Sequence, residues 1–262
     1  MAGHFGARGT RTGPSKGLIA GAPLRFPVRI ADFACLDLAR QGRTGIPEVV
    51  LAEGKRPAHL QRIVGTMLSK TGRAIVTRAS PGAIRSLARL PGRHREYPAA
   101  GVMVLTMPSF CLPARRGTVG ILCAGTSDFK VAEEARIIAE QLGCRTVRAY
   151  DVGVAGVHRL FEALGRMRRQ NVDVYIAVAG REGALPTLLA GMVDRPVIGV
   201  PVSTGYGMAG KGRSALYAML QSCSPLAVVN IDAGFVAGAV AAQIARITPG
   251  QARGGAGRKG RC

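Results

Sequence analysis

Apolar runs alternate with amphipathic segments along most of the chain, most regularly after residue 117. Five short apolar runs there end in or lead into Gly, Ser, Thr or Asp, which is typical of buried parallel strands. Each run precedes a segment whose apolar residues have helical spacing. We expect strands at residues 119–125, 145–151, 172–180, 196–202 and 226–232. We expect helices at residues 131–142, 157–168, 184–193, 214–222 and 233–246.

Five successive βα units predict a three-layer, doubly wound α/β fold with a parallel sheet of the flavodoxin or Rossmann kind. This domain is expected to span residues 118–247. A small α/β domain with a Pro- and Arg-containing linker is expected before it, over residues 28–117. Its predicted strands are 46–54, 73–78 and 101–107, and its predicted helices are 57–69 and 81–90. Basic, Gly-rich composition predicts a flexible N-terminus over residues 1–27 and a disordered tail over 248–262.

The net charge of +21 comes from 36 Lys and Arg against 15 Asp and Glu. Such a charge attracts anions, which include nucleic acids and small nucleotides. Because the arginines are scattered and aromatic residues are only 5% of the chain, nucleic acid is the less favoured partner. The sequence has neither a long apolar span nor a signal-peptide pattern, so we expect a cytoplasmic protein without a membrane partner.

Residues 125–128 (GTSD) stand between the first strand of the parallel domain and its helix. The free N–H groups of a helix N-terminus, with the Thr126 and Ser127 hydroxyls, form a phosphate cradle. The alternative is a helix cap, in which Ser127 or Asp128 accepts backbone N–H groups. The two interpretations are compatible.

Two further loops follow later strands. The loop 179–186 (AGREGALP) carries Glu182, which is either a proton-transfer group or an ordinary acidic residue in a first helical turn. The loop 203–210 (STGYGMAG) contains G-x-G-x-x-G between a strand and a helix. Too little chain follows it for a complete dinucleotide-binding domain. We therefore interpret it as a loop that lets the backbone approach a phosphate or carboxylate.

None of the six cysteines forms a C-x-x-C pair, which gives no support to zinc-ribbon or thioredoxin chemistry. Cys123, inside an apolar strand, is expected to be a core residue. Cys223 lies between a helix end and the last strand. We expect it to join the strand-end loops in one site, although the position alone favours a buried structural cysteine because no helix N-terminus activates it.

Taken together, these motifs resemble the LarB family, carboxylase/hydrolases that begin synthesis of the nickel-pincer nucleotide cofactor. Their catalytic domain is related to the PurE-type mutases, which move a carboxyl group on aminoimidazole ribonucleotide. The resemblance covers residues 30–246, including GIPEVVLAEGK in the N-terminal part. In the parallel domain it rests on GTSD, DVGVAGVHRL, EGALP, VPVSTGYG, and SC followed by VVNIDAGFVAG.

The resemblance implies that the substrate is nicotinic acid adenine dinucleotide. Its pyridinium ring gains a second carboxyl group from CO2 or bicarbonate, and cleavage of the phosphoanhydride releases AMP. The product is pyridinium-3,5-biscarboxylic acid mononucleotide. The resemblance implies no tightly bound cofactor; Mg²⁺ is compatible with such a cleavage, but no ligand cluster in the sequence points to it. A homo-oligomer, an octamer by resemblance, is expected to form its sites at subunit junctions.

The resemblance also assigns roles to residues. It implies that Cys223 is the covalent nucleophile, that Glu182 transfers protons, and that Asp128 transfers protons or positions the substrate. Substrate and phosphate binding is implied for Gly125, Thr126, Ser127, Lys130, Gly180, Ser203, Gly205 and Gly207.

Two positions depart from the family patterns. Ala184 stands where PurE-type enzymes carry a histidine, which argues against aminoimidazole ribonucleotide as the substrate. Lys130 stands where the LarB pattern has a proline, and it is a candidate anion contact. Two alternatives remain open. One is a PurE-like mutase of purine synthesis, and the other is a non-catalytic basic protein that binds nucleotides or nucleic acid.

Overall fold

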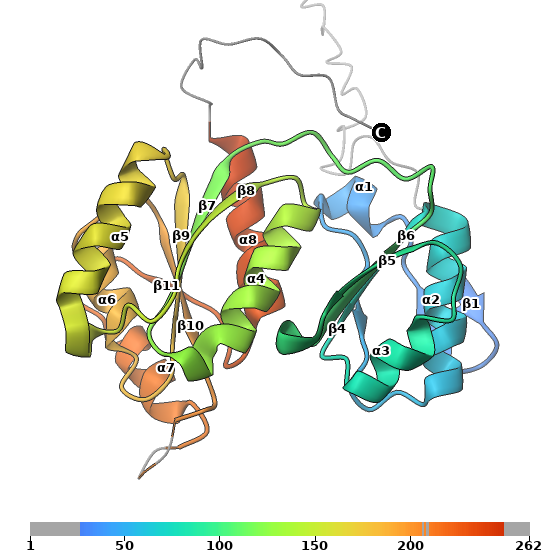
Figure 1. Ribbon diagram of the computed structural model, residues 1–262, viewed down its shortest axis with the longest axis horizontal. Coiled ribbons are helices and arrows are strands. Elements are labelled where there is room, and N and C mark those ends of the chain that lie inside the picture. Colours follow the sequence, from blue (N-terminus) through green and yellow to red (C-terminus); the bar gives the residue numbers. More distant parts are fainter. Residues whose placement is uncertain (1–26, 206, 208–209, 249–262) are drawn as a thin grey trace, which may run out of the picture.

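The computed structural model describes residues 27–205, 207 and 210–248, which form two α/β units (Figure 1). The C-terminal unit contains a five-stranded parallel sheet in the order β11-β10-β9-β7-β8. Its strands are β7 (Thr118–Cys123), β8 (Arg145–Ala149), β9 (Val174–Ala179), β10 (Val197–Pro201) and β11 (Ala227–Val228). The helices between and after them are α4 (Phe129–Gln141), α5 (Val157–Arg169), α6 (Ala184–Ala190), α7 (Arg213–Leu220) and α8 (Gly234–Ile247).

Helices cover both faces of this sheet. The apolar side chains of α4 and α8 pack on one face, and those of α5, α6 and α7 pack on the other. Every residue of β7, β9 and β10 is buried, because a central parallel strand has no solvent face. The predicted three-layer, doubly wound fold is therefore confirmed.

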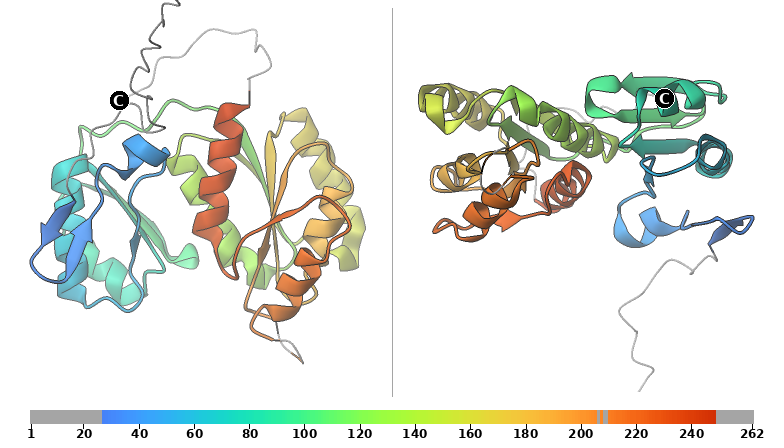
Figure 2. Two further views of the ribbon diagram at one scale, coloured as in Figure 1. Left: turned by 180° about the vertical axis from the view of Figure 1, so that it is seen from behind. Right: turned by 90° about the horizontal axis from the view of Figure 1, so that it is seen from below.

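The N-terminal unit has a four-stranded mixed sheet in the order β3-β4-β6-β5. Its strands are β3 (Val50–Leu51), β4 (Arg73–Thr77), β5 (Arg93–Tyr97) and β6 (Val102–Thr106). One face of this sheet carries α2 (Pro57–Thr71) and α3 (Pro81–Leu87). Its other face contributes Ile75, Val102 and Val104 to the apolar cluster of α4 and α8. Seen from behind, α8 stands between the parallel sheet and the N-terminal unit (Figure 2).

Three strands and one α-helix of the N-terminal unit were not expected from the sequence. They are β1 (Val28–Ile30), β2 (Ala34–Leu36), α1 (Arg40–Thr44) and β5. The strand expected over residues 46–54 is limited to the two residues of β3. In β5, the sequence RHREY has no apolar alternation because it pairs only with β6, at the edge of the sheet.

The units are also joined by polar contacts. Arg73, with 4% of its surface exposed, donates from Nη1 to the carbonyl of Gln141 at 2.7 Å. Its guanidinium lies over the ring of Phe110, and burial lowers its pKa to about 10. The expected flexibility of residues 1–26 and disorder of residues 249–262 concern segments outside the described residues. No helix in the described part of the chain is long and apolar enough to span a bilayer.

The strand order places a topological switch beside β7. From β7 the chain crosses to β8 on one side, and β9 then pairs with β7 on the other side. The loops that leave β7 and β9 therefore diverge, and in open α/β sheets this divergence opens a crevice at the carboxyl ends of the strands. This crevice is where the fold alone predicts a ligand.

Candidate active site

A cavity of about 600 Å³ occupies the switch point. Its walls come from the loops after β7, β8, β9 and β10. Such a volume is within the usual range for small-molecule sites. Of the residues predicted from the sequence, the cavity is lined by Gly125, Ser127, Asp128, Gly180 and Glu182.

Asp128 is the most buried acidic residue of this cavity, with 3% of its surface exposed. It ends the short 3-10 turn Thr126–Asp128 that precedes α4. Its Oδ2 accepts the Gly125 N–H at 3.0 Å, and its Oδ1 accepts the Thr204 hydroxyl at 3.3 Å. Burial raises the pKa of this carboxyl, and the nearby charge of Glu182 adds to the rise. Asp128 is therefore suited to hold and release a proton inside the cavity.

The contact between Asp128 and Gly125 changes the expected phosphate cradle. The Gly125 N–H already donates to the Asp128 carboxylate. This N–H group is therefore part of a helix cap and is not available to a phosphate. Ser127 lines the cavity, whereas Thr126 is exposed and outside its lining. The hydroxyl that does reach the acid belongs to Thr204, which had no role in the sequence analysis. Thr204 was detectable only as part of the VPVSTGYG motif.

Gly180 and Glu182 follow β9. A Cβ at Gly180 would lie 3.1 Å from both Asp128 Oδ1 and Thr204 Oγ1, so a side chain would crowd this junction of three loops. Glu182 is exposed and lines the cavity on the side of Asp128. The structure thus brings a buried and a solvent-exposed carboxyl group together in one cavity.

Strained backbone marks three of the strand ends. Asp151, Arg181 and Asp232 follow β8, β9 and β11, with φ values of 57°, 37° and 56°. This left-handed region costs conformational energy for residues with a side chain, less for Asp than for most, and residues held there cluster at functional sites. Asp151 and Arg181 line the cavity.

The wall formed by β8 and α5 contributes a residue pair that the sequence analysis missed. Arg159 donates to Asp151, and both residues line the cavity. The signal was present in the DVGVAGVHRL motif, which contains both residues but gave neither a role. Arg159 thus places a guanidinium group in the cavity lining, where Asp151 orients it.

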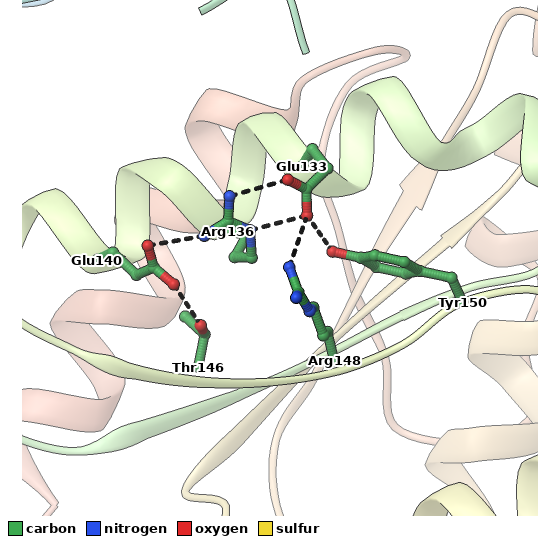
Figure 3. Close-up of polar contacts among 6 residues, drawn as sticks. All are labelled: Glu133, Arg136, Glu140, Thr146, Arg148 and Tyr150. Carbon is green, nitrogen blue, oxygen red and sulfur yellow. Dashed lines mark hydrogen bonds and ion pairs between the residues drawn. The ribbon is translucent and has the colours of Figure 1, made fainter. Parts of the chain in front are cut away.

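A polar network on α4 supports this wall (Figure 3). Arg136 donates to Glu133 at 2.7 and 2.8 Å, and the hydroxyl of Tyr150 also donates to Glu133. The Glu133 carboxylate, in spite of its burial, has a lowered pKa because of Arg136 and Tyr150. The network holds Tyr150, the residue before Asp151, against α4.

The loop after β10 carries three of the predicted binding residues. The Ser203 N–H donates to Asp232 Oδ1 at 2.9 Å, and Ser203 is not part of the cavity lining. Gly205 passes close to Arg181, because a Cβ there would lie 3.1 Å from the Arg181 nitrogen. A Cβ at Gly207 would meet nothing within 4 Å. Tyr206, Met208 and Ala209 of the G-x-G-x-x-G pattern lie outside the described residues.

Lys130 does not line the cavity. Its side chain runs toward the N-terminal unit, where Cε lies 3.6 Å from the position of a Cβ at Gly101. Its charge acts on Glu134, a carboxyl group with 6% of its surface exposed. Burial raises the pKa of Glu134 to about 7, against the opposing influence of Arg78, the Phe235 N–H and Lys130. A Cβ at Gly234 would lie 2.5 Å from the Val131 carbonyl, so α8 begins directly against α4.

The raised pKa of Glu134 predicts a pH-dependent stability. Between its ordinary pKa of 4.5 and about 7, the folded state holds a proton that the unfolded state has lost. Stability therefore falls as pH rises through this interval, by an amount on the order of 3 kcal/mol. Glu134→Gln removes this titration, so its stability relative to the unaltered protein should rise between pH 5 and pH 8. Denaturant unfolding at both values measures the effect.

Glu162→Gln is the matched control, because Glu162 is exposed on α5. Its difference from the unaltered protein should be the same at both pH values. An equally constant difference for Glu134→Gln would contradict the assignment.

Comparison with known proteins identifies the family. A family model described as AIR carboxylase matches residues 118–253, and one described as the LarB/PurE-like N-terminal domain matches residues 28–106. The chain is 44% identical over 235 residues to the uncharacterized protein MJ0165 of Methanocaldococcus jannaschii, covering 86% of this chain and 88% of that relative. The chain belongs to the LarB/PurE-like AIR carboxylase family.

Other relatives in the LarB/PurE-like family carry a functional name. A probable N5-carboxyaminoimidazole ribonucleotide mutase of Methanothermobacter thermautotrophicus is 38% identical over 132 residues, which are 48% of this chain and 37% of that protein. The N5-carboxyaminoimidazole ribonucleotide mutase of Methanocaldococcus jannaschii is 34% identical over 127 residues, which are 47% of this chain and 76% of that protein. Members of this family are generally carboxylases or mutases, and they are typically oligomeric proteins that bind nucleotides.

In this LarB/PurE-like chain, Cys223 is not at the cavity. It follows α7 and precedes β11, whose first residue pairs with Ile198 near the start of β10. Cys223 therefore lies toward the amino ends of the strands and is exposed, whereas the cavity opens at the carboxyl ends. The expectation that Cys223 shares one edge of the sheet with Asp128 and Glu182 is wrong within a single chain, as is the alternative of a buried structural cysteine.

Cys123 directly precedes Ala124, which lines the cavity. It is fully buried in β7, and its thiol lies 3.5 Å from the Gly125 carbonyl. Burial raises its pKa to about 11, so the thiolate that a nucleophile requires is disfavoured. Cys123 is a core residue, as the sequence predicts. No group of three or more His, Cys, Asp or Glu within the described ranges is placed to hold a metal ion.

Proposed function

We propose that this chain carboxylates the pyridinium ring of nicotinic acid adenine dinucleotide and cleaves its phosphoanhydride to release AMP. The product would be pyridinium-3,5-biscarboxylic acid mononucleotide. The observation that carries this proposal is the pairing of Asp128 with Glu182 in a cavity whose wall contains Ala184. PurE-type enzymes have a histidine at that position, and a methyl group there transfers no proton to an aminoimidazole.

The residue types fit the chemistry. A pyridinium ring is electron-poor and does not attack CO2 by itself. Addition of a thiolate to the ring carbon opposite nitrogen gives a neutral enamine, whose neighbouring carbon attacks CO2. A base then removes the proton from the newly carboxylated carbon, and the thiolate leaves as aromaticity returns. We assign proton transfer to Glu182 and Asp128, and contact with the substrate phosphates to Arg159.

The same chemistry requires a thiol, and no cysteine of the described residues lines the cavity. We propose that Cys223 of the partner subunit supplies it in a homo-oligomer. Cys223 is exposed, and it follows a helix whose Tyr217 and Leu220 side chains are 60% and 63% exposed. Tyr217 and Leu220 are three positions apart, so they share one face of the helix, and neighbouring exposed apolar side chains favour association with another protein surface. The family's typical oligomeric state supports a second copy as the occupant.

The proposal is tested by incubating the purified protein with nicotinic acid adenine dinucleotide and isotopically labelled bicarbonate. Mass spectrometry of the small molecules should show AMP and a mononucleotide that carries one added labelled carboxyl group. Parallel reactions with and without Mg²⁺ test the metal requirement. Absence of both products from the folded protein under either condition would reject the proposed reaction.

The mutase remains the second candidate, because relatives that are 34% and 38% identical over about half of this chain have that name. N5-carboxyaminoimidazole ribonucleotide is therefore the second substrate for the same assay. Its conversion to the isomer carboxylated on carbon, with no reaction of nicotinic acid adenine dinucleotide, would favour the mutase. We expect no conversion, because Ala184 replaces the histidine.

A further inference from the structure

Arg78 connects the N-terminal unit to the cavity-forming unit. It follows β4, with a φ of 49° in the left-handed region. Its Nη2 donates to the Asp232 carbonyl at 3.1 Å, and its Nη1 donates to Glu53 Oε2 at 3.2 Å. Asp232 follows β11 and is itself left-handed. Two strained residues from the two units are thus in direct contact.

Asp232 also contacts the loop after β10. Its Oδ1 accepts the Ser203 N–H at 2.9 Å. The next residue, Thr204, donates its hydroxyl to Asp128 Oδ1 at 3.3 Å. A series of adjacent contacts therefore runs from Arg78 to the buried acid of the cavity. Arg78 itself does not line the cavity.

An ordinary surface ion pair does not account for this arrangement. The side chains of Arg78 and Glu53 are 41% and 64% exposed, and ion pairs that are so exposed stabilise proteins only weakly. The contact with Asp232 is different, because it spans 154 positions of the sequence. It fixes the orientation of a residue whose carboxylate holds the cavity loop.

We propose that Arg78 is a positioning residue through which the N-terminal unit sets the geometry of Asp128. The guanidinium fixes Asp232, the Asp232 carboxylate fixes the Ser203 N–H, and Thr204 is thereby held against the acid. Only the effect that we predict on turnover depends on the proposed function. The coupling itself is a property of the protein without substrate.

Hydrogen exchange of the full-length protein tests the coupling directly. In Arg78→Ala, the Ser203 amide should exchange about tenfold faster than in the unaltered protein, because its acceptor is no longer fixed. Arg78→Lys should restore part of the protection. Arg89→Ala is the matched control, since Arg89 is an exposed arginine just beyond α3 of the same unit. Equal exchange at Ser203 in Arg78→Ala and Arg89→Ala would overturn the proposal.

Kinetics give the second readout. Arg78→Ala should lower kcat for nicotinic acid adenine dinucleotide by roughly tenfold to a hundredfold, because small displacements of a catalytic group have effects of that size. KM should change less than about threefold, because Arg78 touches no part of the cavity. A loss confined to KM would contradict the positioning role. If the unaltered protein has no turnover, the proposed function fails, while the exchange measurement still decides the coupling.

Asp232→Gly guards against a variant that merely folds poorly, because it removes the carboxylate that accepts the Ser203 N–H while glycine tolerates the left-handed backbone at this position. It should accelerate exchange at Ser203 as Arg78→Ala does, and the double variant should add little to either single change, because both act on one path. If the increases in Ser203 exchange were fully additive in the double variant, Arg78 and Asp232 would not act through the same series of contacts. Thermal unfolding of each variant establishes that the comparison is made on folded protein.

Discussion

Replacing Cys223 with serine is expected to lower the carboxylation rate by at least about a thousandfold, since a hydroxyl adds to a pyridinium ring far less readily than a thiolate. Label incorporation from bicarbonate measures the loss. The control is Cys35→Ser, because Cys35 is an exposed thiol in the N-terminal unit. Full activity of Cys223→Ser would remove the cysteinyl adduct from the proposed mechanism.

The location of Cys223 gives this prediction a second part. The thiol lies away from the carboxyl edge that carries Glu182, so the proposed mechanism requires the two residues of one site to come from different subunits. Cys223→Ser and Glu182→Gln should each be nearly inactive alone. After dissociation and random reassembly of an equal mixture, about a quarter of the sites should contain both native residues, because each of the two positions comes from the suitable variant in about half of the sites.

Size-exclusion chromatography should first show that the mixture has assembled as the unaltered protein does. Recovered activity near the expected fraction would establish that the site is shared. An assembled mixture with no activity above that of its components would contradict a site shared between subunits.

Asp128→Asn is expected to lower kcat by about a hundredfold to ten-thousandfold, the usual contribution of a proton-transferring group. The amide keeps the shape of the side chain but cannot act as an acid or a base. Its geometry is constrained, because the carboxylate accepts the Gly125 N–H and the Thr204 hydroxyl. Asp194→Asn is the matched control, since the Asp194 side chain is 90% exposed.

The pH profile distinguishes this role from a structural one. Burial raises the pKa of Asp128 above 3.8, so a limb of the kcat/KM profile should lie above that value in the unaltered protein. This limb should be missing from the profile of Asp128→Asn. If the variant keeps the limb and loses only stability, Asp128 is a structural acid.

The parallel domain was readable from the sequence because its physical pattern is local. Each central strand is buried on both faces, which leaves continuous apolar runs such as 174–179. The polar residue after such a run must lie at the carboxyl edge of the sheet. Asp128 and Glu182 therefore line one cavity, as the sequence predicts.

The remaining features depend on contacts between distant residues. The sequence RHREY of β5 is a strand only because β6 pairs with it. Thr204 and Arg159 acquire their partners only when the strand-end loops converge. Lys130 lies in the first turn of α4, and its side chain runs toward the N-terminal unit. Its position in the sequence does not reveal the direction of the side chain. The location of Cys223 was predictable from the order of elements, because a residue that precedes a parallel strand lies at the amino edge of the sheet.

The most direct test of the central claim is the stoichiometry of one reaction. The purified protein, nicotinic acid adenine dinucleotide and carbon-13 bicarbonate are incubated together, and AMP and labelled carboxyl groups are counted in the same samples over time. The proposed mechanism predicts one labelled carboxyl group in the mononucleotide for each AMP once the reaction is complete. AMP release without any label would reduce the activity to hydrolysis and contradict carboxylation at the Asp128–Glu182 cavity.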